Sequence, residues 1–101
     1  MLLNKGIYNG NRILKPESVA LMTSPQTKHV YSWQERQQRD TFYGYGWFVS
    51  KDGIFSHGGS DGTFAWVDPK HQIIGLIFTQ SPGRKNPRDK FMELVRLAIF
   101  D

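Results

Sequence analysis

The sequence predicts an α+β fold, in which an antiparallel meander of three or four strands carries a C-terminal helix on one face. Aromatic and β-branched runs alternate with turn residues between positions 43 and 79, as in a meander. Asp52-Gly53 is a strong hairpin signal between two such runs. The last residues of the chain place apolar side chains at helical spacing, which gives a stripe able to pack across a sheet.

The first 25 residues are predicted to be helical and turn-rich. Met1-Leu2-Leu3 is interpreted either as the last turn of a helix whose beginning is missing or as a frayed terminus. Asn9-Gly10-Asn11 indicates a tight turn. Pro16 suits the first position of a short helix that runs to about Met22, and Pro25 follows its expected end.

A polar loop or lid is expected over residues 26–41, because this stretch is rich in glutamine and charge. Strands are then expected from Tyr43 to Val49, from Ile54 toward His57, and from Gly62 to Val67. Ile73 to Thr79 is a continuous apolar run, and the prediction is a strand buried on both faces.

The final helix is predicted over residues 86–100. Asn86 is expected to cap it, with Pro87 at the first helical position and Asp89 three residues past the cap. The stripe that should face the sheet contains Phe91, Leu94, Val95, Ala98 and Ile99.

Composition indicates a globular chain of one domain or a piece of one. Hydrophobic residues make up 39% of the 101 residues and aromatic residues 14%, which excludes a typical disordered segment. No apolar run approaches the roughly 20 residues that span a membrane. The sequence has no secretory signal and no cysteine, so it leaves the compartment undetermined.

The positive charge of the chain raises the possibility of nucleic-acid binding. The formal net charge is +4, but the basic residues are scattered, and the one cluster lies in Arg84–Lys90 at a loop-to-helix junction. Such a cluster is typical of a solvated surface, so no nucleic-acid partner is expected.

Ser56–Thr63 is the stretch that points most strongly to chemistry. His57 is followed by Gly58 and Gly59 at the end of a predicted strand, and glycine lets a ligand approach the backbone closely. The plainer alternative is an ordinary strand-end histidine bonded to backbone.

Several segments together resemble the C-terminal part of the β-lactamase-related serine hydrolases, the group of class C β-lactamases, penicillin-binding proteins and family VIII esterases. The segments are Met1–Asn4, Tyr8–Leu14, Pro16–Val19, Tyr43–Trp47, His57–Thr63 and Phe91–Leu94. The resemblance implies the C-terminal portion of a β-lactamase/transpeptidase-like domain, and an acyl substrate that is a β-lactam, an ester or a peptide. It also suggests a periplasmic or secreted location.

The family uses a Ser-x-x-Lys motif, a tyrosine motif, and a Lys-Thr-Gly or His-x-Gly motif. His57-Gly58-Gly59 resembles the third. The resemblance implies that the backbone N–H of Ser60 is one of two oxyanion-hole donors and that His57 orients substrate or a proton network. Gly58, Gly59 and Tyr45 are the expected substrate-binding residues.

The other two motifs are missing from the sequence. No serine is followed by lysine three residues later, and no tyrosine by asparagine two residues later. Loss of one oxyanion donor costs about 10²–10³ in rate, whereas loss of a nucleophile costs on the order of 10⁶. The chain alone is therefore predicted to be inactive, to need an upstream half, and to self-associate through surfaces that half would cover. The alternative is a non-catalytic remnant or small binding module.

Three other kinds of site are disfavoured by the sequence. A triad of Ser56, His57, Ser60 and Asp61 is disfavoured because neighbouring strand residues point to opposite faces. His29, His57 and His71 are too dispersed for a metal site, and the Gly58–Gly62 loop lacks the lysine of a phosphate-binding loop. Neither a metal nor a cofactor is expected.

Overall fold

The computed structural model describes residues 1–80 and 87–100. The strands are β1 (Ile7–Tyr8), β2 (Asn11–Arg12), β3 (Thr41–Tyr43), β4 (Phe48–Ser50), β5 (Phe55–Gly58), β6 (Phe64–Asp68) and β7 (Ile73–Ile77). The helices are η1 (Leu2–Asn4), α1 (Pro16–Met22), η2 (Lys28–Val30), α2 (Trp33–Gln38) and α3 (Arg88–Phe100). The α+β class is confirmed, and α1 has the predicted bounds.

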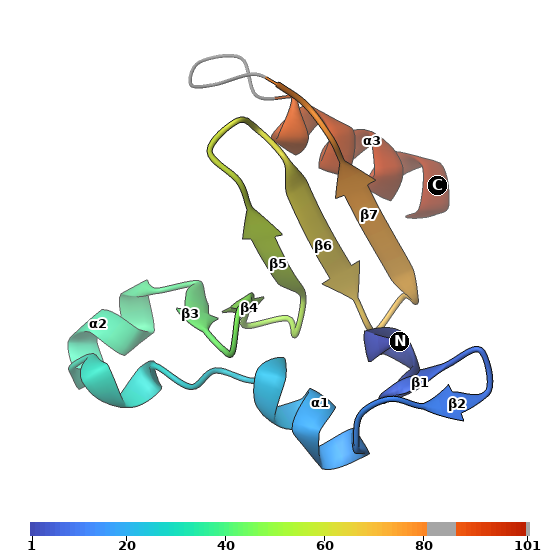
Figure 1. The fold of residues 1–101 in the computed structure, drawn as a ribbon. Helices are drawn as coiled ribbons and strands as arrows, with labels where there is room; N and C mark the ends of the chain where they lie inside the picture. The colour runs from blue at the N-terminus through green and yellow to red at the C-terminus, as the bar shows by residue number, and fades with distance from the viewer. Residues whose placement is uncertain (81–86, 101) are drawn as a thin grey trace.

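The main sheet is an antiparallel meander in the order β3-β4-β5-β6-β7. It has five strands rather than the three or four expected. Figure 1 shows α3 lying against one face of the sheet near β6 and β7, while α1 and α2 lie toward the opposite end of the molecule. Within the described residues, no helix has the length and apolar content that a bilayer crossing requires.

The additional strand arises because Tyr43–Val49 is two strands and not one. The chain reverses after β3, where the Gly44 N–H donates to the Trp47 carbonyl at 2.7 Å. Gly46 has φ 80°, which glycine adopts without the steric cost of a Cβ. The interleaved glycines of this segment therefore mark a hairpin turn.

The expected polar loop over residues 26–41 contains η2 and α2. Ser32 begins α2 with a capping box: its hydroxyl accepts from the Glu35 N–H at 3.3 Å, and the Glu35 carboxylate accepts from the Ser32 N–H at 2.8 Å. These reciprocal bonds satisfy two backbone donors that a helix start leaves open. They explain why a stretch without an apolar stripe is helical.

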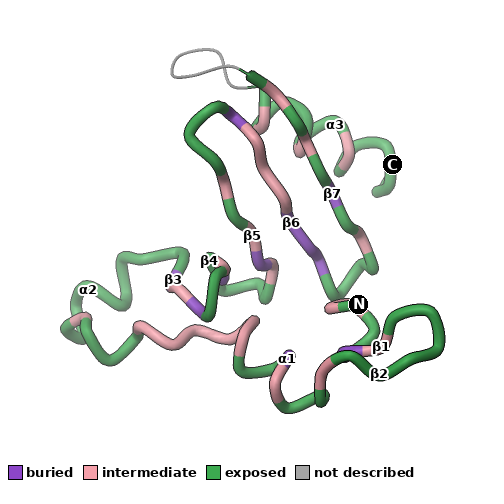
Figure 2. The backbone as a smooth tube through the Cα atoms, viewed as in Figure 1, coloured by how far each residue is buried: buried purple, intermediate pink, exposed green. Residues whose placement is uncertain are grey.

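The core is small and lies where the strands meet the N-terminal turn. Val49, Phe55 and Val67 are buried and pack together, with Trp47 and the η1 leucines against them. Val49 pairs with Phe55, and Phe55 pairs with Val67. Figure 2 shows that buried positions are few and concentrated in the sheet.

β7 is not buried on both faces, contrary to the prediction. It is an edge strand, and the face opposite α3 has no covering element among the described residues. Ile74, Leu76 and Phe78 are 56%, 55% and 83% exposed. A continuous apolar run cannot distinguish a central strand from an edge strand whose outer face is open.

α3 contacts the sheet, but less deeply than its apolar stripe predicted. The Phe91 ring packs edge-on against Trp66, with centroids 5.6 Å apart. Met92 and Val95 line the space between helix and sheet, whereas Leu94 and Ile99 of the predicted stripe are about half exposed. Asn86, the expected cap, lies outside the described residues, and the helix begins after Pro87.

Candidate functional site

His57 lies near the end of β5, with both ring nitrogens in hydrogen bonds. Nδ1 is 2.8 Å from the Gly58 carbonyl oxygen, and Nε2 is 3.0 Å from the Tyr43 hydroxyl. A carbonyl oxygen only accepts, so the neutral ring carries its proton on Nδ1. Nε2 is then the acceptor, and the Tyr43 hydroxyl donates to it.

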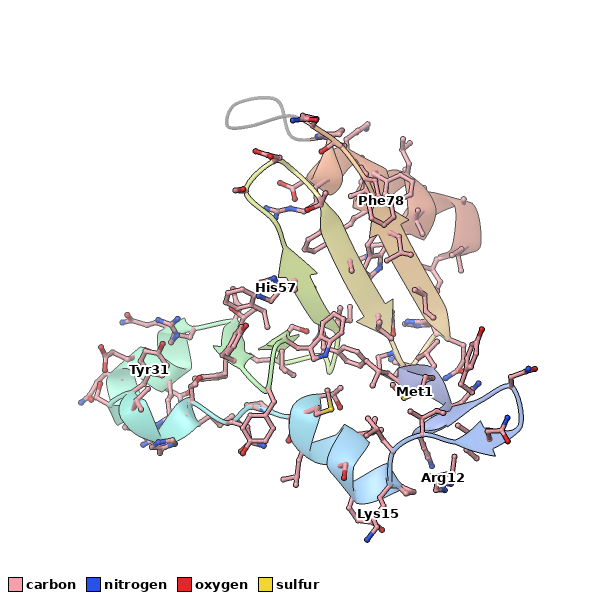
Figure 3. All side chains as sticks on the ribbon, in the orientation of Figure 1. Met1, Arg12, Lys15, Tyr31, His57 and Phe78 are labelled. Atoms are coloured by element: carbon pink, nitrogen blue, oxygen red, sulfur yellow. The ribbon has the colours of Figure 1, made fainter. Side chains whose placement is uncertain are left out.

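Aromatic rings hold this pair in place. The Phe48 ring lies 4.9 Å from that of Tyr43 and 5.5 Å from that of His57, centroid to centroid. Figure 3 shows His57 where β5 meets the β3–β4 hairpin. The imidazole is exposed, so it remains accessible to a ligand.

The loop after His57 is narrow and fixed by backbone hydrogen bonds. The Gly59 N–H donates to the Thr63 carbonyl at 2.8 Å, and the Gly62 N–H donates to the Gly59 carbonyl at 3.3 Å. A Cβ at Gly59 would collide with the Thr63 hydroxyl, so a larger residue there would force the Thr63 side chain to move. The Thr79 hydroxyl, two residues after β7 ends, anchors the loop by donating to the Asp61 carbonyl at 2.9 Å.

Ser60 is exposed at the tip of this loop. Its backbone N–H donates to no acceptor within residues 1–80 and 87–100. A backbone donor without an internal partner can receive an anionic or carbonyl oxygen without first breaking an internal bond.

Two hollows meet at the glycine pair. One, of about 510 Å³, lies on the α3 side and is also lined by Phe64 and Arg88. The other, of about 230 Å³, lies on the open face beside His57 and Leu76. Gly58 and Gly59 line both hollows, so their backbone can be reached from either side.

The structure brings together His57, Gly58 and Gly59, and Ser60 follows them in the loop without lining either hollow. Tyr45 is apart from this group: its side chain is 55% exposed, its N–H donates to the Met22 carbonyl, and it lines neither hollow. Tyr43 takes the position beside His57. The sequence contains both tyrosines, but only the hairpin at residues 44–47 decides which one reaches the histidine.

No triad forms from the serines near His57. Ser56 pairs with Trp66 in the ladder, and His57 pairs with Ala65, so their side chains leave the strand on opposite faces. The described residues also contain no group of three or more histidine, cysteine or acidic side chains placed to hold a metal ion. His71 instead pairs with Asp68 in the β6–β7 turn, with Nδ1 and Oδ2 2.7 Å apart.

Residues 3–98 match the protein-family model described as Beta-lactamase. A solved structure from Bacillus anthracis, provisionally assigned as a 6-aminohexanoate-dimer hydrolase, has a similar fold. The TM-score is 0.68, the sequence identity is 23%, and the match covers 97% of this chain. The chain spans only 25% of that protein. No curated protein sequence matches the chain significantly.

Proposed function

Because the chain belongs to the beta-lactamase family, we propose that it forms one wall of the pocket of a serine hydrolase that transfers acyl groups. The observation that carries the proposal is the backbone N–H of the exposed residue Ser60, which donates to no acceptor among the described residues and lies in the loop that follows His57. The proposed substrate is a small acyl compound with a β-lactam, ester or peptide bond. No nucleic acid is required.

In the proposed mechanism, the Ser60 N–H stabilises negative charge on the substrate carbonyl oxygen. A fixed donor aimed at developing charge costs no reorganisation during the reaction. Neutral His57 accepts from Tyr43, and this pair orients the substrate or passes a proton beside it. Gly58 and Gly59 let the substrate lie against the backbone.

We propose that the nucleophile that attacks the substrate lies outside these 101 residues. The sequence has no Ser-x-x-Lys, and the Bacillus anthracis relative is about four times as long as the segment matched here. We therefore propose that this chain is the C-terminal portion of the hydrolase and is inactive alone. The missing Ser-x-x-Lys equally supports a second candidate, a non-catalytic remnant or binding module on the same scaffold.

Two measurements separate these candidates. The first reads the genomic sequence immediately upstream in every frame, where the hydrolase proposal expects Ser-x-x-Lys. The second assays the 101-residue chain, and the longer product if one is encoded, on a chromogenic β-lactam, a short-chain ester and the 6-aminohexanoate dimer. The longer product should turn over at least one of these, and the short chain should turn over none.

The oxyanion role has its own test in the longer product. Ser60→Pro removes the N–H, whereas Ser60→Ala keeps it. We expect Ser60→Pro to lower kcat by about 10²–10³, with Ser60→Ala close to wild type. Circular dichroism must show the same fold for both. If the two folded variants were equally active, the Ser60 N–H would not act as an oxyanion donor. Separately, if the 101-residue chain turned over a substrate and Ser60→Ala abolished that turnover, the prediction that the chain is inactive alone would be wrong.

A further inference from the structure

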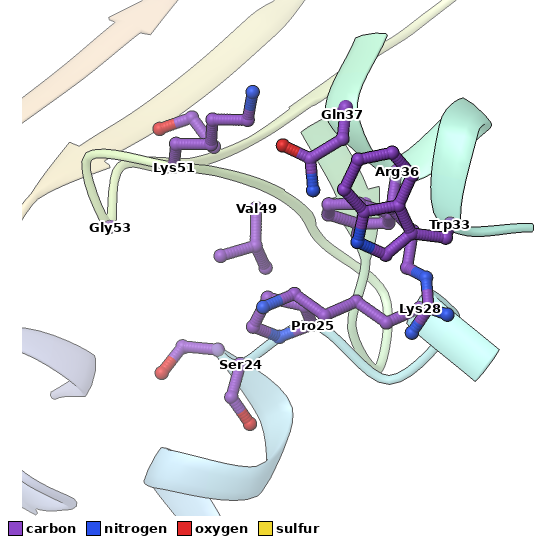
Figure 4. Close-up of a pocket in the computed structure, with 12 residues that line it drawn as sticks. Ser24, Pro25, Lys28, Trp33, Arg36, Gln37, Val49, Lys51 and Gly53 are labelled. Atoms are coloured by element: carbon purple, nitrogen blue, oxygen red, sulfur yellow. The ribbon is translucent and has the colours of Figure 1, made fainter. Parts of the chain in front are cut away.

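A separate cavity, of about 610 Å³, lies between α2 and the β3–β4 hairpin. Ligand cavities are typically roughly 300–1,000 Å³. Figure 4 shows Trp33, Arg36 and Gln37 gathered on the α2 side, Ser24 and Pro25 across from them, and Val49 between the two groups. None of its lining residues lines the hollows at Gly58 and Gly59, so it is a separate site.

The charged side chains that line this cavity are all positive. Lys28, Arg36 and Lys51 line it, and no aspartate or glutamate is among the lining residues. Lys51 makes a loose, exposed ion pair with Asp40, with Nζ and Oδ1 3.8 Å apart. Within the described part of the chain, Lys28 and Arg36 form no ion pair with a carboxylate. An anion entering the cavity therefore meets at least two cations that are not already neutralised.

The cavity also has an apolar and aromatic surface. Phe42 and Val49 are 5% and 2% exposed and form its floor. The Lys28 ammonium lies over the Phe42 ring, 5.6 Å from its centroid. Trp33 lines the cavity with its side chain 66% exposed, which leaves an indole face available to a flat apolar group.

One polar atom in this region lacks a partner. Ser50 lines the cavity, and its hydroxyl oxygen is buried without a hydrogen-bond partner among the described residues. Less than 1 Å² of this oxygen is accessible, and the Ser50 side chain leaves β4 on the face opposite Val49, so it takes no part in the ligand site proposed below.

We propose that the cavity binds a small organic anion: a carboxylate held by Lys28 and Arg36, with an apolar or aromatic body against Trp33, Phe42 and Val49. The proposal does not depend on the hydrolase function, because the two sites share no lining residue. It assigns α2 a role in ligand binding, with Ser32 and Glu35 fixing the start of the helix that presents Trp33 and Arg36.

The test compares 1-naphthaleneacetate with 1-naphthaleneacetamide, which has similar shape and no charge. Each is titrated into the ¹⁵N-labelled chain, and the three indole N–H signals are assigned with tryptophan-to-phenylalanine variants. We expect the acid to shift the Trp33 signal saturably and to bind about tenfold more tightly than the amide. Affinity for the acid should fall as salt is added.

Variants identify the cations responsible. Lys28→Met with Arg36→Met keeps the aliphatic stems and should weaken binding of the acid by about tenfold or more. Lys28→Arg should retain binding, and Lys15→Met removes an exposed cation outside the cavity as the matched control. The proposal would be overturned if the acid and the amide bound equally tightly, or if the double variant bound the acid as tightly as wild type. It would also be overturned if the shifts appeared at Trp47 or Trp66 instead of Trp33, or if millimolar ligand gave no saturable shift.

Discussion

At the scale of single residues, the His57–Tyr43 pair is the feature with the clearest chemical consequence. The Gly58 carbonyl accepts from Nδ1, and this one contact fixes which ring nitrogen remains basic. A histidine in the other tautomer would turn a donor toward Tyr43 and could not accept a proton from it. The acid–base role proposed for this pair therefore depends on a backbone carbonyl.

We expect neutral His57 to be the Nδ1–H tautomer, with Nε2 unprotonated. The ¹⁵N shifts and long-range couplings of the imidazole ring distinguish the two nitrogens directly. Tyr43→Phe should keep the same tautomer, because the Gly58 contact does not involve Tyr43, while the Nε2 signal moves as its hydrogen bond is lost. A predominantly Nε2–H ring in the wild-type chain would contradict this assignment.

A second residue-scale prediction concerns Gly75. A Cβ there would overlap the buried ring of Trp66, its partner across the β6–β7 pair. Gly75→Ala should therefore lower the free energy of unfolding by about 1–3 kcal/mol. Urea unfolding followed by circular dichroism measures the loss. In a Trp66→Leu background the same substitution should cost much less, and an equal cost in both backgrounds would show that the ring is not responsible.

Residue-level signals predicted part of the site and missed part of it. His57, Gly58 and Gly59 are adjacent in sequence, so their proximity needed no knowledge of the fold. Tyr43 reaches His57 only because the chain reverses at residues 44–47, and alternation along one supposed strand could not reveal that reversal. Tyr45, the tyrosine expected to bind substrate, lines neither hollow at the glycine pair, and its substrate-binding role stays a prediction.

At the scale of helices and strands, local turn chemistry was the most reliable guide. Pro16 marked the start of α1, and the turn at Asp52-Gly53 follows from a residue pair that favours it. α2 was missed although Ser32 and Glu35 have capping-box spacing, because the segment has no apolar stripe. For β7, the continuous apolar run correctly predicted a strand. Its burial depends on which elements cover its two faces, and the run does not specify them.

The β6–β7 turn contains the titrating pair most closely tied to the fold. Burial acts to raise the pKa of Asp68, but hydrogen bonds from the His71 ring and N–H, together with the charge of His71, hold that pKa below its usual value. A carboxyl whose pKa is lowered by folding stabilises the folded state above its unfolded pKa. That stabilisation is lost as the pH falls through the lowered folded pKa.

We therefore expect Asp68→Asn to destabilise the chain near neutral pH, on the order of 1–2 kcal/mol. The difference from wild type should shrink as the pH falls below about 4, where Asp68 of the unfolded chain becomes protonated, and should be lost once the pH passes the lowered pKa of the folded state. Urea unfolding over a series of pH values measures this difference, with Asp40→Asn as an exposed control that should change little. A difference that stays constant down to pH 2 would show that the Asp68 charge does not contribute.

At the scale of the whole molecule, the chain is more open than a typical domain of its size. Its Cα radius of gyration is 15.0 Å, compared with about 13 Å for a compact domain of 100 residues. The core contains few buried side chains, and α3 contributes none. Large apolar side chains are instead exposed on the open face of β7 and on the outer face of α3.

These exposed surfaces lead to the prediction that the isolated chain associates with a second copy through β7. The strand carries no charge between Ile73 and Ile77, and as an edge strand it presents unpaired backbone groups. If two copies of β7 paired antiparallel about Gly75, Ile74 of each copy would lie opposite Leu76 of the other. The apolar side chains of the two copies would then contact each other. Sedimentation velocity over a concentration series should show a dimer or larger species at micromolar concentration.

A charge placed on that edge should prevent the association. Leu76→Lys puts an ammonium where the two copies would meet, and burying it without a partner opposes pairing. Leu94→Lys is the matched control, because Leu94 on α3 is 51% exposed and Leu76 is 55% exposed. Leu76→Lys should sediment as a monomer while Leu94→Lys associates like wild type. If both variants lose association equally, the contact lies on α3 as much as on β7. A wild-type chain that stays monomeric and unfolds cooperatively at all concentrations would show that this small core is sufficient without a partner.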